Sequence, residues 1–414
     1  MNLPLSADRL WADLMAMAAI GGTPKGGCNR QTLTDLDGQG RALLTEWCAA
    51  IGLTPGLDRL GNMTFTRPGR DPSKKPVAIG SHLDTQPTGG KYDGVLGVLT
   101  GLEVLRAVHE AGIETEAPLM LINWTNEEGA RFSPPMMGSG AAMGFFEEAA
   151  TLAQADHEGL RFGDELTRIG WAGGDDPAAL QNLGAYFEVH IEQGPVLERE
   201  GLSIGVVTHA LAQAWFDVTV TGDDAHGGSA MAGRRDAMMG AAELVLAVER
   251  IALTTLAPSG EPGRGTVGRL TVTPDSRNVV PSKIWFSVDF RHSDEAALAA
   301  MGEALRAEAL AVGARRRVAA EVDTFWLCPM TPFDPALVGH VRDAARRLAI
   351  PHKEMPTAIG HDAVYVARRL PATMIFVPCH GGISHNEAES ITQDWAEAGL
   401  RVLADAVLAA AKVA

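Results

Sequence analysis

The sequence predicts an α/β protein that carries a second, smaller α+β domain as an insertion. Apolar strand-like runs alternate with helical segments in the first and the last part of the chain, and this alternation is typical of a sheet whose central strands are buried. Between these parts the order becomes strand, helix, two strands, helix and strand, which is typical of a small two-layer domain. We therefore expect a first domain of residues 1–210 and 328–414, and an inserted domain of residues 211–327.

Short apolar runs and the turns between them define the elements of the first domain. The expected helices cover residues 6–18, 38–51, 94–110 and 394–413, and the clearest expected strands cover residues 77–81 and 118–125. Ligands of such sheets bind beyond the carboxyl ends of the strands, so polar residues at those ends are the first candidates for a site.

The inserted domain begins where the pattern changes near Leu211. Alternating apolar and polar residues predict half-buried strands there, and the longer segments between them predict helices. The expected elements are a strand at 214–220, a helix at 234–257, strands at 265–273 and 283–290, a helix at 294–312 and a strand at 319–326.

Composition limits the class of protein. The chain has 414 residues, 46% of them hydrophobic, which is enough for more than one globular domain. Its 51 acidic and 35 basic residues give a formal charge of −16, which opposes nucleic acid and anionic membrane surfaces as partners. Four scattered cysteines, a start without a signal-peptide pattern and the lack of an apolar run that could cross a bilayer favour a cytoplasmic setting.

Acidic residues and one histidine gather at the ends of the two clearest strands. His82 and Asp84 follow the first strand, Asp93 lies in a glycine-rich turn, and Glu127 with Glu128 follows the second strand. Such carboxylates and imidazoles are metal ligands, and the glutamate pair offers one ligand and one spare base. Asp84 could bind a metal itself or hold the imidazole tautomer from behind. Each residue alone also has an ordinary structural explanation, so the prediction of metal-assisted hydrolysis depends on their joint placement.

Further histidines fit the same pattern. His190 ends another β-branched segment, His385 follows an apolar run, and His226 lies among glycines inside the inserted domain. A single histidine of this kind is more often structural, but several at the ends of elements indicate a site. His361, after Gly360, either starts a helix or lies near the substrate.

With these residues in view, the chain resembles the hydantoinase/carbamoylase branch of the dinuclear metallopeptidase-like amidohydrolases. This branch includes N-carbamoyl-L-amino-acid hydrolases, β-ureidopropionases and allantoate amidohydrolases. The resemblance runs over nearly the whole chain, through segments 80–94, 126–132, 188–195, 276–281, 289–292 and 382–386. It implies a zinc-exopeptidase-like catalytic domain and an inserted dimerisation or lid domain.

The resemblance assigns the candidate ligands to two divalent metal ions. By position, one ion would be held by His82, Asp93 and His190, and the other by Asp93, Glu128 and His385, so that Asp93 bridges them. Zinc is the first expectation, and manganese, cobalt and nickel suit the same ligands.

The resemblance also implies roles for residues around the metals. Glu127 would be the general base, Asp84 would orient a ligand, and Gln193 would contact the ureido group. Gly360 and His361 would make further contacts with the substrate.

Three residues of the inserted domain complete the implied site. Asn278 and Arg291 would bind the substrate carboxylate, Arg291 as a two-pronged donor. His226 would reach the site of a partner subunit and stabilise the oxyanion there, so a homodimer is expected.

The implied reaction is cleavage of the ureido C–N bond of an N-carbamoyl α- or β-amino acid to the amino acid, carbon dioxide and ammonia. Alternatives on the same site are an allantoate-type reaction and hydrolysis of an N-acyl amino acid or dipeptide. A catalytically silent binding protein is disfavoured by the spare base at Glu127. Residues 227–230 and 379–381 depart from the pattern of the branch and point to an unusual substrate pocket. Cys379 beside His380 would also suit a thiol nucleophile, but a third member is not identifiable.

Overall fold

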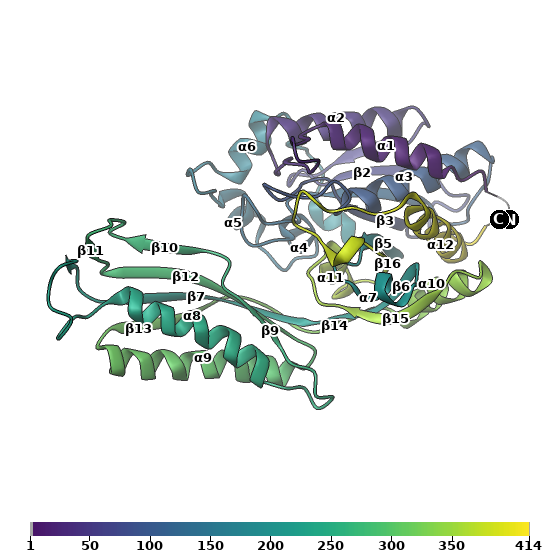
Figure 1. The fold of residues 1–414 in the computed structure, drawn as a ribbon. Helices are drawn as coiled ribbons and strands as arrows, with labels where there is room; N and C mark the ends of the chain where they lie inside the picture. Colours follow the sequence, from purple (N-terminus) through teal and green to yellow (C-terminus); the bar gives the residue numbers. More distant parts are fainter. Residues whose placement is uncertain (1–2, 414) are drawn as a thin grey trace. The chain divides into compact units, whose positions relative to one another are not determined.

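The computed structural model describes residues 3–413 and forms two compact units (Figure 1). One unit contains the chain up to His209 and from Pro332 onward, and the other runs from Ala210 to Thr331. Each combines helices with one main sheet, which confirms the expected α/β class with an inserted α+β unit.

The first unit is built on a mixed nine-stranded sheet. Its central strands lie in the order β4 (Leu119–Trp124), β3 (Val77–His82), β5 (Ala185–Ile191) and β16 (Ala372–Val377), and all four run parallel. Nearly all of their residues are buried, which explains why these sequences are mostly apolar instead of alternating. The parallel direction brings four carboxyl ends to one edge of the sheet.

Five further strands flank this parallel core. They are β1 (Thr54–Leu57), β2 (Met63–Arg67), β6 (Ile204–Ala210), β14 (Thr331–Pro332) and β15 (His352–Thr357). β2 pairs antiparallel with β4, and β6 pairs antiparallel with β16, so an antiparallel pairing bounds the four parallel strands on each side.

Helices surround the sheet of the first unit. The longer ones are α1 (Ala7–Ala19), α2 (Asp35–Ala49), α3 (Val95–Glu110), α10 (Pro335–Arg347) and α12 (Gln393–Ala411). The shorter ones are α4 (Met137–Ala142), α5 (Glu148–Ala153), α6 (Phe162–Arg168), α7 (Val196–Glu200) and α11 (Asp362–Ala367), with 3-10 turns η1 (Pro177–Asn182) and η2 (His380–Gly382). Hydroxyls of Ser6, Thr34 and Thr392 accept a backbone N–H and so begin α1, α2 and α12. α3 packs on β3 and is buried along almost its whole length, which makes it a rigid support for the turn before it.

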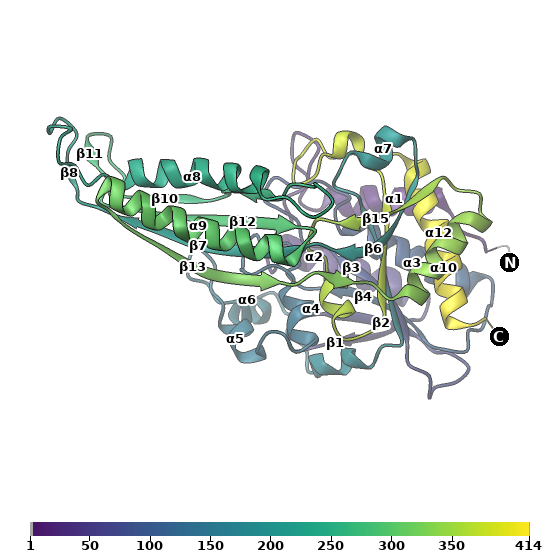
Figure 2. The ribbon, with the colours of Figure 1, turned by 90° about the horizontal axis from the view of Figure 1, so that it is seen from below.

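The second unit is a sheet with two helices packed on it (Figure 2). Its strands lie in the order β10 (Leu270–Thr273), β12 (Lys283–His292), β7 (Ala212–Thr221) and β13 (Ala319–Cys328). The helices are α8 (Ala237–Thr254) and α9 (Glu295–Arg316). Alternate residues of β7 and β12 are buried and form one apolar core with these helices.

The expected single strand over residues 265–273 is wrong. The structure divides it into β9 (Arg264–Thr266) and β10, and both pair with β12, β9 opposite Asp289–Arg291 and β10 opposite Lys283–Phe286. Gly268 lies in the break between them, where a residue without a side chain weakens the strand.

A short ribbon projects from the second unit. It pairs β8 (Ala225–His226) with β11 (Val279–Val280). Among the helices of residues 3–413, none has both the length and the apolar character needed to cross a membrane.

Candidate metal centre and active site

The candidate residues lie at or just after the carboxyl ends of the four parallel strands, at one edge of the sheet. His82 is the last residue of β3, His190 is the last but one of β5, and His385 lies in the loop after β16. Glu127 and Glu128 follow β4, which pairs in register with β3 up to His82. Residues far apart in the sequence meet here because parallel strands end together.

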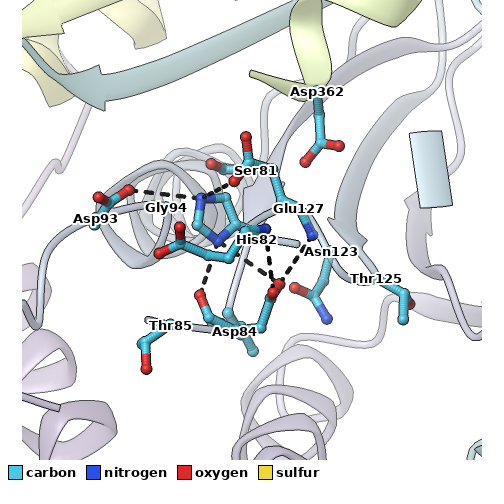
Figure 3. Close-up of polar contacts among 12 residues, drawn as sticks. Ser81, His82, Asp84, Thr85, Asp93, Gly94, Asn123, Thr125, Glu127 and Asp362 are labelled. Carbon is cyan, nitrogen blue, oxygen red and sulfur yellow. Dashed lines mark hydrogen bonds and ion pairs between the residues drawn. The ribbon is translucent and has the colours of Figure 1, made fainter. Parts of the chain in front are cut away.

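His82 presents a free ring nitrogen to this edge. Its Nδ1 lies 2.9 Å from the carbonyl oxygen of Asp84, so Nδ1 carries the proton and Nε2 holds the lone pair. Nε2 is buried without a hydrogen-bond partner, 3.4 Å from Glu127 Oε2 and 3.7 Å from Asp93 Oδ1. Figure 3 shows Asp93 and Glu127 on the Nε2 side of the ring and Asp84 on the opposite side. Burial lowers the pKa of His82, which favours the neutral, ligating form.

Asp93 lies between two histidines. Its Oδ1 is 3.0 Å from His190 Nε2, and its Oδ2 is 3.5 Å from His385 Nε2. Burial alone would raise the pKa of Asp93, but the imidazoles of His190, His385 and His82 outweigh burial and lower it. The carboxylate therefore stays ionised, with one oxygen directed at each histidine.

Two ligand groups share Asp93. One contains His82, Asp93 and His190, and the other contains Asp93, Glu128 and His385, with candidate ligand atoms within 4.8 Å of one another in each group. In the second group Glu128 Oε2 lies 3.2 Å from His385 Nε2. Each group thus combines carboxylates with one or two imidazoles, and Zn²⁺ and related divalent ions bind such ligands.

The site passes a test for a bound cation. A buried imidazole nitrogen without a partner is costly unless something binds it. Gly94 adds a second sign, because a Cβ at this position would lie 2.3 Å from the ring of His82. The turn thus brings the chain as close as possible to the ligand, which only glycine allows.

Glu127 is not part of either ligand group, although it is buried beside them. Burial raises the pKa of Glu127 well above its ordinary range, and the neighbouring carboxylates of Asp362 and Glu128 raise it further. A carboxyl group with a raised pKa can accept and return a proton near neutral pH.

Asp84 orients His82, as expected, but through its backbone and not through its side chain. Its carbonyl oxygen, and not its carboxylate, accepts the hydrogen bond from His82, since the carboxylate lies 3.7 Å from Nδ1. The carboxylate instead accepts the backbone N–H groups of Glu127 and Glu128, at 3.3 Å each. Asp84 therefore connects the end of β3 to the glutamate pair. Burial, with Glu128 nearby, raises its pKa to about 8.

Gln193 and His385 both have left-handed backbone conformations, with φ of 54° and 53°. Such conformations cost energy in non-glycine residues and concentrate at functional sites. Gln193 Nε2 donates to Asp93 Oδ2 at 2.8 Å and to Ser384 Oγ at 2.9 Å, while its Oε1 is buried without a partner. Nearly half of the His385 side chain is exposed, at 48%, so this side of the site is open to solvent.

His361 belongs to the same cluster. Its buried ring lies 4.4 Å from the ring of His190, and Glu188 lies within ligand distance of both. Gly360, which precedes it, is half-buried. Gly360 and His361 were predicted to contact the substrate, and the structure has the ring of His361 against the candidate metal ligand His190.

The structure separates the three predicted residues of the second unit. Asn278 lies beside His226, because the Asn278 carbonyl accepts the N–H of Gly227 at 2.6 Å and β8 pairs with β11. Arg291 lies near the other end of β12, where its guanidinium binds Asp289 at 2.7 Å. Arg291 lies eight positions after Lys283 along the strand, a span of about 27 Å at the usual strand rise. Asn278 and Arg291 of one chain therefore do not bind one carboxylate together within this unit.

Several buried polar residues at the site had no predicted role. Asp362 accepts a hydrogen bond from Ser139 Oγ at 2.5 Å and has one oxygen without a partner. Glu389 accepts backbone N–H groups from the turn that holds Asp93. In the sequence, only their closeness to His361 and His385 indicated that Asp362 and Glu389 belong to the site.

The chain is similar to known hydrolases over its full length. Residues 78–409 match the model of peptidase family M20/M25/M40. The chain belongs to this family. It is 48% identical over 414 residues to an N-carbamoyl-L-amino-acid amidohydrolase of Rhizobium meliloti, covering 100% of this chain and 98% of the relative. It is 33% identical to a ureidoglycolate hydrolase of Arabidopsis thaliana, covering 97% of this chain and 86% of the relative.

A solved structure extends this similarity to the fold. The amidase of the hydantoinase/carbamoylase family from Burkholderia vietnamiensis matches with a TM-score of 0.93 and 45% identity, covering 99% of each chain. The chain is thus a hydrolase of the hydantoinase/carbamoylase branch of family M20, a metal-dependent family, and its substrates are small molecules.

Proposed function

We propose that the protein is a dinuclear metal-dependent amidohydrolase that cleaves the ureido C–N bond of an N-carbamoyl amino acid. The observation that carries the proposal is the convergence of two ligand groups on Asp93, with the buried Glu127 beside them. The relative at 48% identity, an N-carbamoyl-L-amino-acid amidohydrolase, supports this class of substrate.

In this proposal His82, Asp93 and His190 hold one divalent ion, and Asp93, Glu128 and His385 hold the other. Zinc is the first candidate, with manganese, cobalt or nickel as alternatives. When bound, the pair of ions would supply Lewis acidity and lower the pKa of a water molecule toward neutrality.

The chain supplies the proton transfer. Glu127 accepts the proton of the attacking water and returns it to the leaving nitrogen, for which its raised pKa is suited. The Asp84 carboxylate accepts the backbone N–H groups of Glu127 and Glu128, and so fixes the position of the proposed base relative to the proposed ligand. Transfer to nitrogen releases carbamate, which decomposes to carbon dioxide and ammonia and leaves the free amino acid.

We propose that polar groups near the ligands bind the ureido group. The buried Oε1 of Gln193 has no partner and can accept a ureido N–H, while its Nε2 is held by Asp93 and Ser384. His361 lies against His190, and Gly360 directly precedes it, so both are proposed to contact the substrate on this side. We propose that Arg291 binds the substrate carboxylate. In the structure its guanidinium binds the carboxylate of Asp289.

We further propose a homodimer in which His226 and Asn278 serve the partner's site as one group. Their proximity to each other supports this pairing. On α8, Leu246 and Leu253 are 68% and 60% exposed and lie seven residues apart, which places an apolar stripe on one helix face. A Leu246→Glu substitution is expected to shift the protein from dimer to monomer in sedimentation velocity, and an unchanged dimer would argue against α8 as the interface.

The proposed activity is tested by loading the metal-free protein with zinc, manganese or cobalt and measuring ammonia release from N-carbamoyl amino acids. Absence of turnover with metal bound would refute the substrate class. Ureidoglycolate and allantoate are a second class, supported by the Arabidopsis relative, and the same assay distinguishes them. N-acyl amino acids and dipeptides would release an acid or an amino acid without ammonia. A cytoplasmic location is also proposed, from the scattered cysteines of the sequence.

A further inference from the structure

Glu389 is a buried glutamate that the proposed reaction leaves unused. It lies between His385 and α12, and one oxygen, Oε1, accepts the backbone N–H groups of Tyr92 at 2.9 Å and Asp93 at 3.1 Å. These amides belong to the turn that carries the shared ligand of both metal groups. The loop after β16 is therefore hydrogen-bonded to the turn after β3.

The same loop also contacts the side chain of Asp93. Ser384 Oγ donates to Asp93 Oδ2 at 2.8 Å and lies 3.3 Å from Glu389 Oε2. Ser384 directly precedes His385, a ligand of the second group. Glu389 and Ser384 thus hold the backbone and the carboxylate of Asp93 from one segment, which also sets the position of His385.

Packing fixes Glu389 in this place. A Cβ added at Gly90 would lie 2.0 Å from both the carboxyl carbon and Oε1 of Glu389, so the carboxylate lies directly against the turn. Both strong contacts of the side chain come from N–H donors, and an acceptor-only carboxylate satisfies both. An alanine at Gly90 would displace this carboxylate without removing its charge.

We propose that Glu389 is a positioning residue that holds Asp93, the carboxylate that both ligand groups share, and couples Asp93 to His385. This inference rests on the proposed dinuclear centre. Residues that orient ligands from behind typically change metal affinity by about 10–100-fold when they are replaced. Glu389 contacts the turn and Ser384, so its effect reaches the metal through Asp93 and the loop.

The test compares zinc affinity of metal-free proteins by competition with a chromophoric chelator, without any substrate. The variants are Glu389→Met, which keeps about the same size but removes both acceptor oxygens and the charge, and Gly90→Ala, which displaces the carboxylate. The control is Glu103→Met, because Glu103 is also a buried glutamate that accepts a backbone N–H, from Ser6 at 2.8 Å, and binds Arg9 at 2.7 Å. Circular dichroism and thermal melting monitor the fold of each variant.

We expect Glu389→Met and Gly90→Ala to weaken zinc binding by about 10–100-fold, and Glu103→Met to keep wild-type affinity even if it melts earlier. Two-ion binding by the wild type with unchanged affinity in both site variants would overturn this inference and leave the proposed function standing. A wild type that binds no divalent metal would overturn both. An equal loss of affinity in Glu103→Met would assign the effect to general instability and also overturn the inference. If Glu389→Met fails to fold, Gly90→Ala decides, because it moves the same carboxylate.

Discussion

A single methyl group at Gly94 tests the geometry of the proposed centre directly. Gly94 has a φ of 67° and follows Asp93, and a Cβ there would lie 2.3 Å from the ring of His82. Carbon atoms normally approach to about 3.5 Å, so the ring must move by about 1 Å in a Gly94→Ala chain. The ring is fully buried and held at Nδ1 by the Asp84 carbonyl, so it cannot swing freely into solvent.

The expected loss of stability has two parts. Overpacking a buried site costs about 1–3 kcal/mol. The backbone of Gly94, with φ of 67° and ψ of −48°, lies outside the left-handed helical region, and such a conformation costs about 1–3 kcal/mol in alanine. We therefore expect Gly94→Ala to lower the free energy of unfolding by about 2–6 kcal/mol. Gly112→Ala tests a positive φ without overpacking, because Gly112 has a φ of 61° and no atom within 4 Å of a built Cβ. That control is expected to lose only about 1–2 kcal/mol.

Zinc affinity gives the second measurement. Moving His82 removes a ligand from the first group, so Gly94→Ala is expected to lose at least about 10–100-fold in affinity, whereas Gly112→Ala keeps it. Urea denaturation of the metal-free proteins and zinc titration would measure both effects. Equal stability of the two variants, with wild-type zinc affinity in Gly94→Ala, would refute the close packing of Gly94 on His82 as the reason for glycine.

Three other predictions follow from the site. Glu127→Gln is expected to lower kcat by about 10²–10⁴-fold while metal content stays unchanged, and wild-type turnover would refute its role as base. Co-expressed His226→Ala and Arg291→Ala chains, each nearly inactive alone, are expected to regain part of the activity as mixed dimers, and a lack of rescue would contradict their placement in different subunits. In the metal-free protein, burial lowers the pKa of His190 and His385 but their carboxylate partners raise both to about 9. Because these folded-state pKa values exceed the ordinary value of 6.5, protonation of the two imidazoles stabilises the metal-free fold. This stabilisation is complete below about pH 6.5 and is lost as pH rises through about 9. Zinc affinity rises over the same range, because the ligands must lose their protons to bind the metal. Denaturation and zinc titration across this range would check the signs, and flat profiles would contradict them.

Much of the architecture was predictable because it depends on local patterns. The apolar runs of β3 and β4 mark buried parallel strands, and the alternation in β7 marks a sheet with one covered face. Edge strands were harder to predict. β1 contains Pro55 and Gly56, which disfavour strands, and it forms only because β2 pairs with it.

The sequence by itself determined which residues stand at the ends of the central strands, and hence the ligand types gathered at one edge of the sheet. The tertiary structure alone decided which atoms meet. It showed that the carbonyl of Asp84 holds His82, that Asn278 lies with His226 and away from Arg291, and that Glu389 reaches the turn of Asp93. The reason is physical: periodicity records which face of an element is buried, whereas hydrogen bonds between distant segments depend on strand order and register, which no local pattern contains.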